Sequence, residues 1–372
     1  MNPSTSFLRQ ICAGLFWAAL GAECMAAAPT YSVTPLAVQS LYPTSYAKDL
    51  NNAGQVTGLA YLPNANGATY SFLYGSGNTV NIGGLGGTNP LGNGYSPTDA
   101  QAINDVGQVV GGSYSSSYPD IRAFLYSNGQ MTDLGTLGGS FSQAYGVNNA
   151  GEVVGMSVTA GNKNSATFLY SGGQMINLAT LGASFTDVTA INNHSQILGT
   201  AGGHAAIFSQ GAMTDLGTLG SALSIPAAIN DGGQATGYSY TADSFTRAFR
   251  YSGGQMIDLG TLGGSYSQGK DINAAGDVVG ISNNGIDGFG HGFLYTGGTM
   301  YDLNNLVGSS DWLIGEAQRI NDNGTILASG CHQQQGCMSL LLSVTSVPEP
   351  GSMALTLAGV AVVGAKLRRR RG

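Results

Sequence analysis

The sequence predicts an all-β protein, a β-propeller of seven four-stranded blades that is closed by its N-terminal strand. Three observations predict this fold. Glycine supplies 59 of the 372 residues and charged side chains only 9%, which favours many turns and excludes long helices with solvated outer faces. Hydrophobic residues make up 42%, which excludes a disordered polar chain. A short marker, Asn-x-x-Gly, also returns along the chain at a regular spacing, which is typical of repeat architectures.

The marker is interpreted as a tight turn between two strands. An apolar residue usually precedes it and a short β-like run follows it. The Gly at its fourth position supplies the positive φ angle that such a turn needs, and one copy has Ser195 there instead. Copies lie 38 to 53 residues apart, about the length of one propeller blade, although an open β-solenoid is an alternative architecture. The seven copies begin at Asn51, Asn104, Asn148, Asn192, Asn230, Asn273 and Asn321.

The third unit shows how four short strands fit into one repeat. We expect strands at residues 144–148, 152–159, 166–170 and 174–178. Phe-Leu-Tyr recurs in the third strand of most units and is typical of a strand buried on both faces. An aspartate recurs near the end of the fourth strand, one per unit, so we expect it to bond backbone amides at a turn and not to form a catalytic pair. It is found at Asp133, Asp215, Asp258 and Asp302.

The two ends of the array predict how the ring closes. Tyr31–Leu36 is similar to the fourth strand of a unit but has no earlier strands beside it. The last unit has its marker at Asn321 and a third strand at Ser339–Leu342, and then stops. The first strand is therefore expected to complete the last blade and to leave neither edge unpaired.

Both termini look like processing segments. Residues 1–28 contain Arg9, an apolar run over residues 11–20 and small residues at 26–28, which is typical of a secretory signal. The propeller is expected over residues 29–346. Residues 347–372 hold a Pro-rich motif, an apolar helix over residues 353–365 and a basic end, so a membrane contact through residues 353–367 is expected, with the basic end on the cytoplasmic side. A plain C-terminal anchor is the alternative.

The tail resembles the PEP-CTERM sorting signal on the strength of Val347, Pro348, Glu349 and Pro350, followed by the apolar and basic parts in that order. The resemblance implies recognition by an exosortase, cleavage near the motif and release to the cell surface or matrix. A transient or lasting inner-membrane anchor is expected at this end.

The repeats resemble the HAF repeat of secreted bacterial proteins, which has His-Ala-Phe before Leu-Tyr. In this chain the His position holds His291, Arg122 or Arg247 in different units, and His204 lies near its expected place. The resemblance implies no catalytic role, and the changing residue excludes a metal ligand repeated in every unit.

The charge and cysteine content of the body exclude one class of partner and predict one bond. Seven basic and eighteen acidic residues lie between positions 29 and 346, so we expect no nucleic acid partner. Cys331 and Cys337 are the cysteines of this region and should form a disulfide in an exported protein. Zinc bound by these two with His332 is an alternative that lacks a fourth ligand.

Residues that break the repeat are the candidates for chemistry, because irregular residues gather in a propeller's funnel and loops. Trp312, Glu316 and Arg319 are the candidate ligand contacts, with Trp312 able to stack on a sugar ring. No cofactor or metal is expected. A weak calcium possibility attaches to residues 49–54 and 271–276, where the Glu that ends an EF-type loop is missing. Other repeat-breaking residues are Lys48, Asp99, His194 and Lys270.

Together these features predict an exported surface or extracellular-matrix protein. We expect a non-enzymatic binding or scaffold module that is linked to exopolysaccharide or biofilm and binds polysaccharide or surface proteins. The alternative is a propeller-type hydrolase or lyase acting on extracellular polysaccharide. That activity would need a cluster such as Glu316 with Asp99 or His194, and no catalytic residue is predicted.

Overall fold

The computed structural model describes residues 28–36, 38, 45–61, 69–86, 98–116, 120–308 and 311–346. Tyr31–Val344 form one compact unit. The predicted sorting tail and, except for Ala28, the predicted signal segment lie outside the described residues, as does the apolar helix expected over residues 353–365. None of the helices in the described part of the chain has the length and apolar character needed to cross a bilayer.

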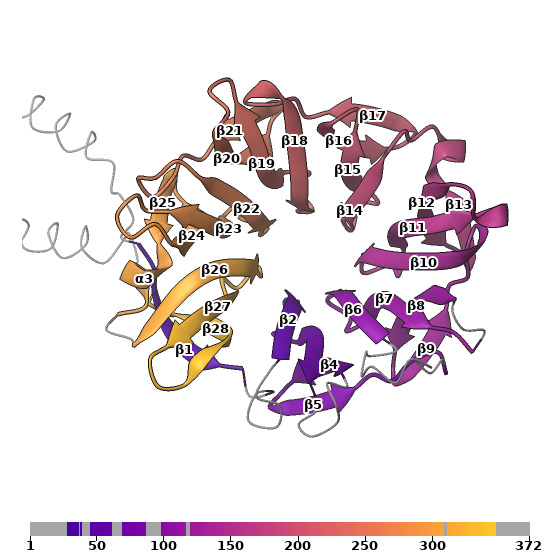
Figure 1. Cartoon of the computed structure of the whole chain (residues 1–372), viewed down its shortest axis with the longest axis horizontal. Coiled ribbons are helices and arrows are strands. Elements are labelled where there is room, and N and C mark those ends of the chain that lie inside the picture. The colour runs from indigo at the N-terminus through magenta and orange to yellow at the C-terminus, as the bar shows by residue number, and fades with distance from the viewer. Residues whose placement is uncertain are drawn as a thin grey trace, which may run out of the picture. The chain divides into compact units, whose positions relative to one another are not determined.

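Each repeat supplies four antiparallel strands, ordered from the centre of the ring outward (Figure 1). The innermost strands are β2 (Ser45–Leu50), β6 (Thr98–Ile103), β10 (Gly138–Val147), β14 (Asp187–Ile191), β18 (Gly220–Ile229), β22 (Ser267–Ile272) and β26 (Trp312–Ile320). The second strands are β3 (Val56–Tyr61), β7 (Val109–Tyr114), β11 (Val153–Thr159), β15 (Ile197–Ala201), β19 (Ala235–Thr241), β23 (Val278–Asn283) and β27 (Ile326–His332).

The third and fourth strands complete each unit toward the outside. The third strands are β4 (Thr69–Gly75), β8 (Ile121–Ser127), β12 (Ser165–Ser171), β16 (His204–Ser209), β20 (Thr246–Ser252), β24 (Gly290–Thr296) and β28 (Gly336–Ser346). The outermost strands are β5 (Asn78–Asn81), β9 (Gln130–Asp133), β13 (Gln174–Asn177), β17 (Ala212–Asp215), β21 (Gln255–Asp258), β25 (Thr299–Asp302) and β1 (Thr30–Pro35). Three helical turns join strands, η1 (Ala160–Asn162), η2 (Leu178–Leu181) and α3 (Leu303–Leu306).

The propeller-like, all-β prediction is confirmed, but the expectation of seven separate blades needs correction. The described strands form five separate four-stranded sheets and one eight-stranded sheet. The large sheet contains two four-stranded units, β6–β9 and β10–β13, joined by one parallel pair between Ile121 and Phe141. Strand β10 makes this link because it begins earlier than predicted, at Gly138, and its first residues pass the edge of β8.

The hydrophobic core lies between neighbouring units. The Phe of each Phe-Leu-Tyr is fully buried, whereas the Leu and Tyr beside it are mostly half-buried, so burial on both faces is less complete than predicted. One cluster packs Val154 of β11 against Val188, Ile191 and Phe208 of the next unit. Because each unit covers the face of its neighbour, a missing unit would expose apolar surface on both sides of the gap.

The predicted closure is confirmed, because β1 is the fourth strand of the last sheet, in the order β1-β28-β27-β26. The Leu36 amide donates to the Ser339 carbonyl at 3.1 Å, and the Ser32 hydroxyl donates to the Ser343 carbonyl at 3.3 Å. Tyr31 and Leu36 are buried in this arrangement. The two ends of the array are thus held together by backbone pairing.

Deleting residues 29–37 should lower the melting temperature of the whole ring, because the deletion removes Tyr31 and Leu36 from the core and exposes the edge of β28. The loss should appear as one cooperative transition moved to lower temperature by calorimetry. A truncated chain that melts like the parent would show that β1 does not hold the ring closed.

Candidate functional site

The centre of the ring is shaped by an irregularity that every innermost strand shares. In each unit the pairing with the second strand skips one residue, three positions before the marker asparagine. Such a β-bulge bends a strand and redirects its side chains. Residues two and three positions before the marker therefore line pockets in the channel at the centre of the ring. In the first unit these are Asp49 and Lys48.

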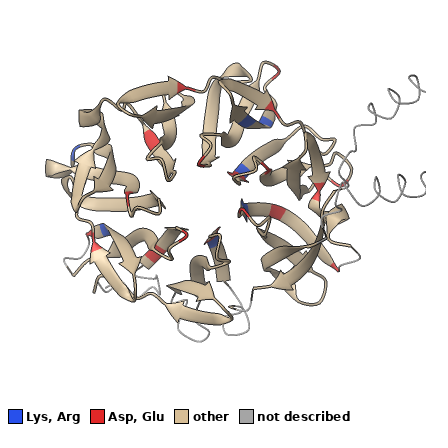
Figure 2. Ribbon diagram, turned by 180° about the vertical axis from the view of Figure 1, so that it is seen from behind, with Lys and Arg blue, Asp and Glu red and all other residues tan. Residues whose placement is uncertain are grey.

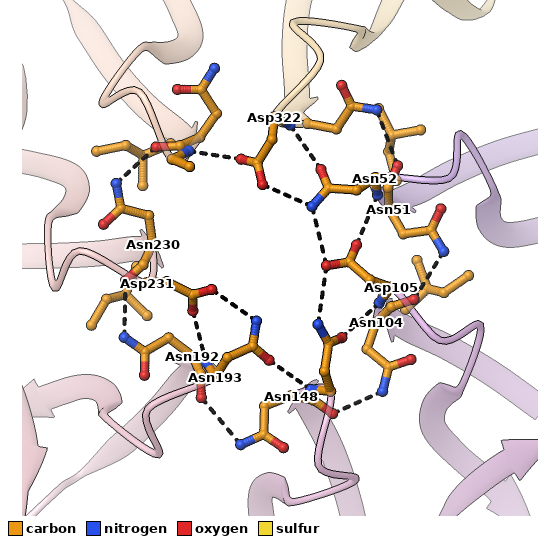
Figure 3. Close-up of a pocket in the computed structure, with 18 of the residues that line it drawn as sticks. Asn51, Asn52, Asn104, Asp105, Asn148, Asn192, Asn193, Asn230, Asp231 and Asp322 are labelled. Atoms are coloured by element: carbon orange, nitrogen blue, oxygen red, sulfur yellow. Dashed lines mark hydrogen bonds between the residues drawn. The ribbon is translucent and has the colours of Figure 1, made fainter.

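The marker asparagines form what we name the amide ring, a circle of buried side chains that joins unit to unit (Figure 3). The Oδ1 of Asn104 accepts the Gln108 amide at 2.8 Å within its own turn. The Nδ2 of Asn104 donates to the backbone carbonyl of Asn148, the next marker, at 2.8 Å. In the described part of the chain, six of the seven markers donate in this way to the next unit. The seventh, Asn273, donates instead to Asp277 in its own turn.

The residues that follow the markers form a second circle, the axial ring (Asn52, Asp105, Asn149, Asn193, Asp231, Ala274 and Asp322). Most of its backbone amides donate to the side chain of the next member; for example, the Asp105 amide donates to Oδ1 of Asn149 at 2.9 Å. The circle lacks one acceptor, because Ala274 has no side-chain oxygen. The two rings together line a pocket of about 180 Å³.

Charged residues meet on one side of the channel, which we name the charged wall (Figure 2). Nε of Arg319 lies 2.8 Å from Oδ1 of Asp49, which comes from the other end of the chain. Nearby, Lys48 pairs with Asp99 at 2.6 Å and Lys270 with Glu316 at 3.0 Å. These residues come from four neighbouring units, whose innermost strands are β22, β26, β2 and β6.

Two half-buried carboxylates, Asp49 and Asp271, interact with the single guanidinium of Arg319, and the pKa values of all three groups are shifted. Burial raises the pKa of Asp271 to about 7, against the attraction of Arg319 and with the repulsion of Asp49. Burial also raises the pKa of Asp49, although Arg319 and the Ile103 amide oppose it. Burial works against the charge of Arg319, but the carboxylates of Asp49 and Asp271 outweigh it and raise the Arg319 pKa.

The opposite side of the channel is the neutral wall, built mostly of small residues on β10, β14 and β18. With Asp49, Asp271 and Arg319 it encloses a pocket of about 140 Å³. Its members are Tyr145, Gly146, Thr189, Ala190, Ala227 and Ala228.

The recurring aspartates do what the sequence predicts of them. Oδ1 of Asp133 accepts the Gly135 amide at 2.7 Å, and Asp215, Asp258 and Asp302 accept the corresponding amides. The residue at the His position also reaches this aspartate in three units, and in one of them Arg122 lies 4.0 Å from Asp133. His204 lies 2.9 Å from Asp215, and His291 lies 2.7 Å from Asp302. These residues stabilise the edge of a unit.

Of the three candidate ligand contacts, the structure brings two together. Glu316 and Arg319 line the same pocket, of about 230 Å³, with Lys48 and Lys270. Trp312 lies at the start of β26, where its ring centroid is 5.0 Å from that of His332, and it lines neither pocket. His194 lies in the turn after Asn192, whereas Asp99 and Glu316 lie five residues before their markers.

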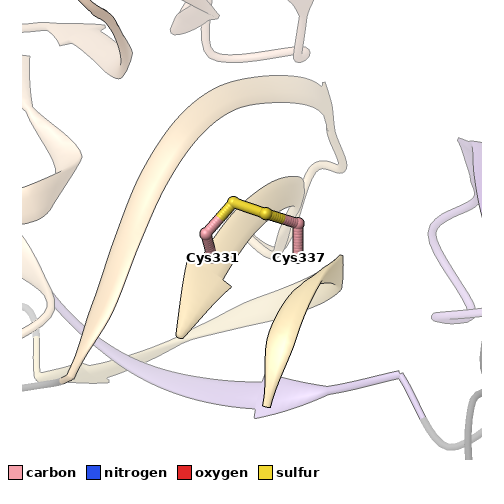
Figure 4. The surroundings of a disulfide bond; sticks show 2 residues. All are labelled: Cys331 and Cys337. Carbon is pink, nitrogen blue, oxygen red and sulfur yellow. A yellow bond between two sulfur atoms is a disulfide. The ribbon is translucent and has the colours of Figure 1, made fainter. Parts of the chain in front are cut away.

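The predicted disulfide between Cys331 and Cys337 is present (Figure 4). The two residues face each other across the β27–β28 hairpin, so the bond fastens the strands that receive β1. Within the described residues no group of three or more His, Cys, Asp or Glu side chains could hold a metal ion.

Comparisons with known proteins identify one segment and the fold. Residues 346–371 match the model of the PEP-CTERM protein-sorting motif. This motif implies export and sorting at the cell envelope, with recognition by an exosortase. No curated protein sequence matches the chain.

Solved structures are similar to the chain in fold alone. A Mycobacterium tuberculosis puromycin-hydrolyzing peptidase aligns with a TM-score of 0.51 and 12% identity, over 87% of this chain and 58% of that one. A Pyrococcus horikoshii acylaminoacyl peptidase aligns with a TM-score of 0.50 and 10% identity, over 82% and 52%. The chain thus spans little more than half the length of either peptidase.

Sequence reasoning found most of the charged wall but gave Asp49 and Asp271 a different role, as parts of calcium-like loops. The sequence does contain a pattern that marks Asp49 and Asp271 as unusual. The position two residues before the marker is Ala or Gly in four units and is charged at Asp49, Asp271 and Arg319. The axial carboxylates Asp105, Asp231 and Asp322 were missed because a residue beside a turn gives no sign of facing an axis.

Replacing Asn104 by Ala should destabilise the ring by about 1–3 kcal/mol, because the Gln108 amide loses its acceptor and the Asn148 carbonyl loses one of its two donors, keeping the Gly151 amide. Asn273→Ala is the matched control and should cost less, since Asn273 bonds only within its own turn among the described hydrogen bonds. Chemical denaturation of both variants measures the difference. Equal losses would mean that the inter-unit bond adds nothing to stability.

Asp271→Asn should stabilise the protein at pH 8, with the gain fading as the pH falls through 7 toward 4. The pKa of Asp271 is about 7 when folded and near 3.8 when unfolded. The unfolded chain therefore holds fewer protons between these values, and the native carboxyl lowers stability as the pH rises. Asp49→Asn should act in the same direction but with a smaller gain, because the pKa of Asp49 is also raised while its carboxylate holds the ion pair with Arg319. Urea titrations across this pH range test both, and a pH-independent Asp271→Asn effect would contradict the prediction.

Proposed function

We propose that the chain is an exported protein of the cell surface or extracellular matrix that acts as a non-enzymatic binding or scaffold module. The sorting motif at residues 346–371 carries this proposal, because it stands at the end of a repeat ring that has its own core and closure. An exosortase would act at the motif, and residues 353–367 would hold the chain at the inner membrane before or after sorting. The partners would be exopolysaccharide or other surface proteins.

The proposal includes two finer assignments. The four-stranded units are HAF-type repeats, in which the residue at the His position contacts the turn aspartate. His204 with Asp215 and His291 with Asp302 support this reading. The acidic body supports a partner other than nucleic acid.

The contacts of the acidic residues favour binding over hydrolysis. A glycosidase needs two carboxyl groups facing the same bond, one of them free to move a proton. Glu316 lies 3.0 Å from Lys270 and Asp99 lies 2.6 Å from Lys48, so each carboxylate already has a cation beside it. His194 belongs to a marker turn and not to the stretch that holds these two acids.

The proposal predicts that the exported chain binds extracellular polysaccharide and does not cleave it. A glycan array gives the binding, and a reducing-end assay on the bound glycans measures turnover. Release of reducing ends that disappears in Glu316→Gln would contradict the proposal and support a hydrolase or lyase. A second experiment tests sorting. A variant that lacks Arg368–Arg371 should fail to reach its normal place on the cell surface, and cell fractionation would measure this loss.

A further inference from the structure

We propose that the channel pocket between the charged wall and the neutral wall binds a primary ammonium group on a small polar molecule, with Asp271 as its counter-charge. This inference deepens the binding role proposed above and rests on it. It names a site inside the ring and the chemistry that the site selects.

The charges around the pocket leave one carboxylate without a cation of its own. Nε of Arg319 donates to Asp49, and its NH1 donates to the Gln318 carbonyl at 2.8 Å. Asp271 accepts the backbone amide of Ile320 at 2.9 Å, but within the described part of the chain no side chain donates to it. One guanidinium and two carboxylates give the site one excess negative charge.

The size of the pocket sets what can enter. A volume of about 140 Å³ equals about five water molecules and is well below the roughly 300–1,000 Å³ of pockets that enclose drug-sized ligands. The pocket therefore takes the charged group of a ligand, or one small molecule, and not a polysaccharide chain.

The neutral wall suits an ammonium that also bears a polar body. Tyr145, which also packs against the core, and Thr189 add a phenol and a hydroxyl to the lining, while Ala190, Ala227 and Ala228 leave space. An ammonium is attracted to the face of a tyrosine ring and donates hydrogen bonds to hydroxyl oxygens. An anion would instead meet Asp49 and Asp271.

A bare metal ion fits this pocket less well than an ammonium. Calcium needs six to eight oxygen ligands, and no group of three acidic, His or Cys side chains in the described residues is arranged to hold a metal. Arg319 already lies against Asp49, so the two carboxylates do not close on one ion. A primary ammonium needs only one counter-charge and a few acceptors.

The state of Asp271 without ligand agrees with this reading. Its pKa of about 7 reflects a carboxylate buried without enough positive charge. An ammonium would supply that charge, so the binding of methylammonium, which stays protonated throughout, should strengthen as the pH rises from 6 to 8. The other titratable or charged groups around the site are Lys48, Asp49, Tyr145, Lys270, Glu316 and Arg319, together with Asp187, whose charge acts on Tyr145.

Isothermal titration of the purified exported chain with three sugars of similar size tests the site. Glucosamine carries the ammonium, whereas glucose and N-acetylglucosamine do not. We expect heat from glucosamine alone and, in a second arm, from methylammonium, which carries the ammonium without a sugar. The inference would be overturned if glucose bound as tightly as glucosamine. It would also be overturned if neither glucosamine nor methylammonium bound. Calcium that binds and is lost in Asp271→Asn would also overturn it.

Two variants locate the binding. Asp271→Asn should weaken glucosamine binding about ten- to a hundredfold, the usual effect of losing a charged hydrogen-bond partner. Ala227→Tyr should block the pocket without changing any charge, and Tyr145 occupies the same repeat position in β10. Asp243→Asn, in the exposed turn between β19 and β20, removes one negative charge away from the channel and should leave binding within about twofold. Equal binding by all three variants would place the amine elsewhere.

The outcomes also separate this site from the proposed function. A chain that binds polysaccharide but no amine would keep the surface role and lose the channel site. A chain that binds glucosamine through Asp271 but is neither sorted to the surface nor bound to polysaccharide would keep the site and lose the role.

Discussion

The ring depends on the hydrogen bonds of its marker asparagines. Each of these side chains is buried, and its carboxamide can accept within its own turn and donate outward at the same time. Asn104 does both, toward the Gln108 amide and toward the Asn148 carbonyl. The same residue therefore shapes a turn and fixes its distance to the next unit. A residue with only a donor or only an acceptor could not serve both ends.

Because the marker asparagines have a structural role, residues that could bind a ligand are found at the positions beside them. The marker, its Gly, the buried Phe and the turn aspartate are all committed to shape, and they vary little from unit to unit. The two positions after each bulge face the channel and pack less tightly, so they can change without unfolding a blade. They hold Lys48 and Asp49 in one unit and Ala227 and Ala228 in another. The asymmetry of the channel follows from this freedom.

The parts of this fold that sequence could predict are those that depend on neighbours along the chain. The positive φ of the marker glycines needs only the turn itself, and Ser195, the exception, is held at a φ of 56°. The Asp133 turn and the Cys331–Cys337 bond are equally local. Three features were not predictable in this way. The β-bulge of the innermost strands has no characteristic residue. The eight-stranded sheet depends on a single pair of residues between β8 and β10. The contact of Asp49 with Arg319 forms only when the ring is closed.

The contact of Arg319 with Asp49 also explains why charge gathers where it does. The last unit meets the first along β26 and β2, and the chain crosses this seam once, between β1 of the last sheet and β2 of the first. Asn321 donates to the Asn51 carbonyl at 3.1 Å and the Asp322 amide to Asn52 at 2.8 Å, so the seam repeats the bonds made elsewhere. Arg319 with Asp49 adds an ion pair to this seam, and the junctions on either side of it carry the pairs Lys270–Glu316 and Lys48–Asp99. Closure accounts for that pair but not for Asp271, which lies one unit away and raises the electrostatic cost of the folded state. The Ile320 amide needs an acceptor at Asp271 but not a charge, so the negative charge of Asp271 is the feature that the proposed ammonium ligand explains.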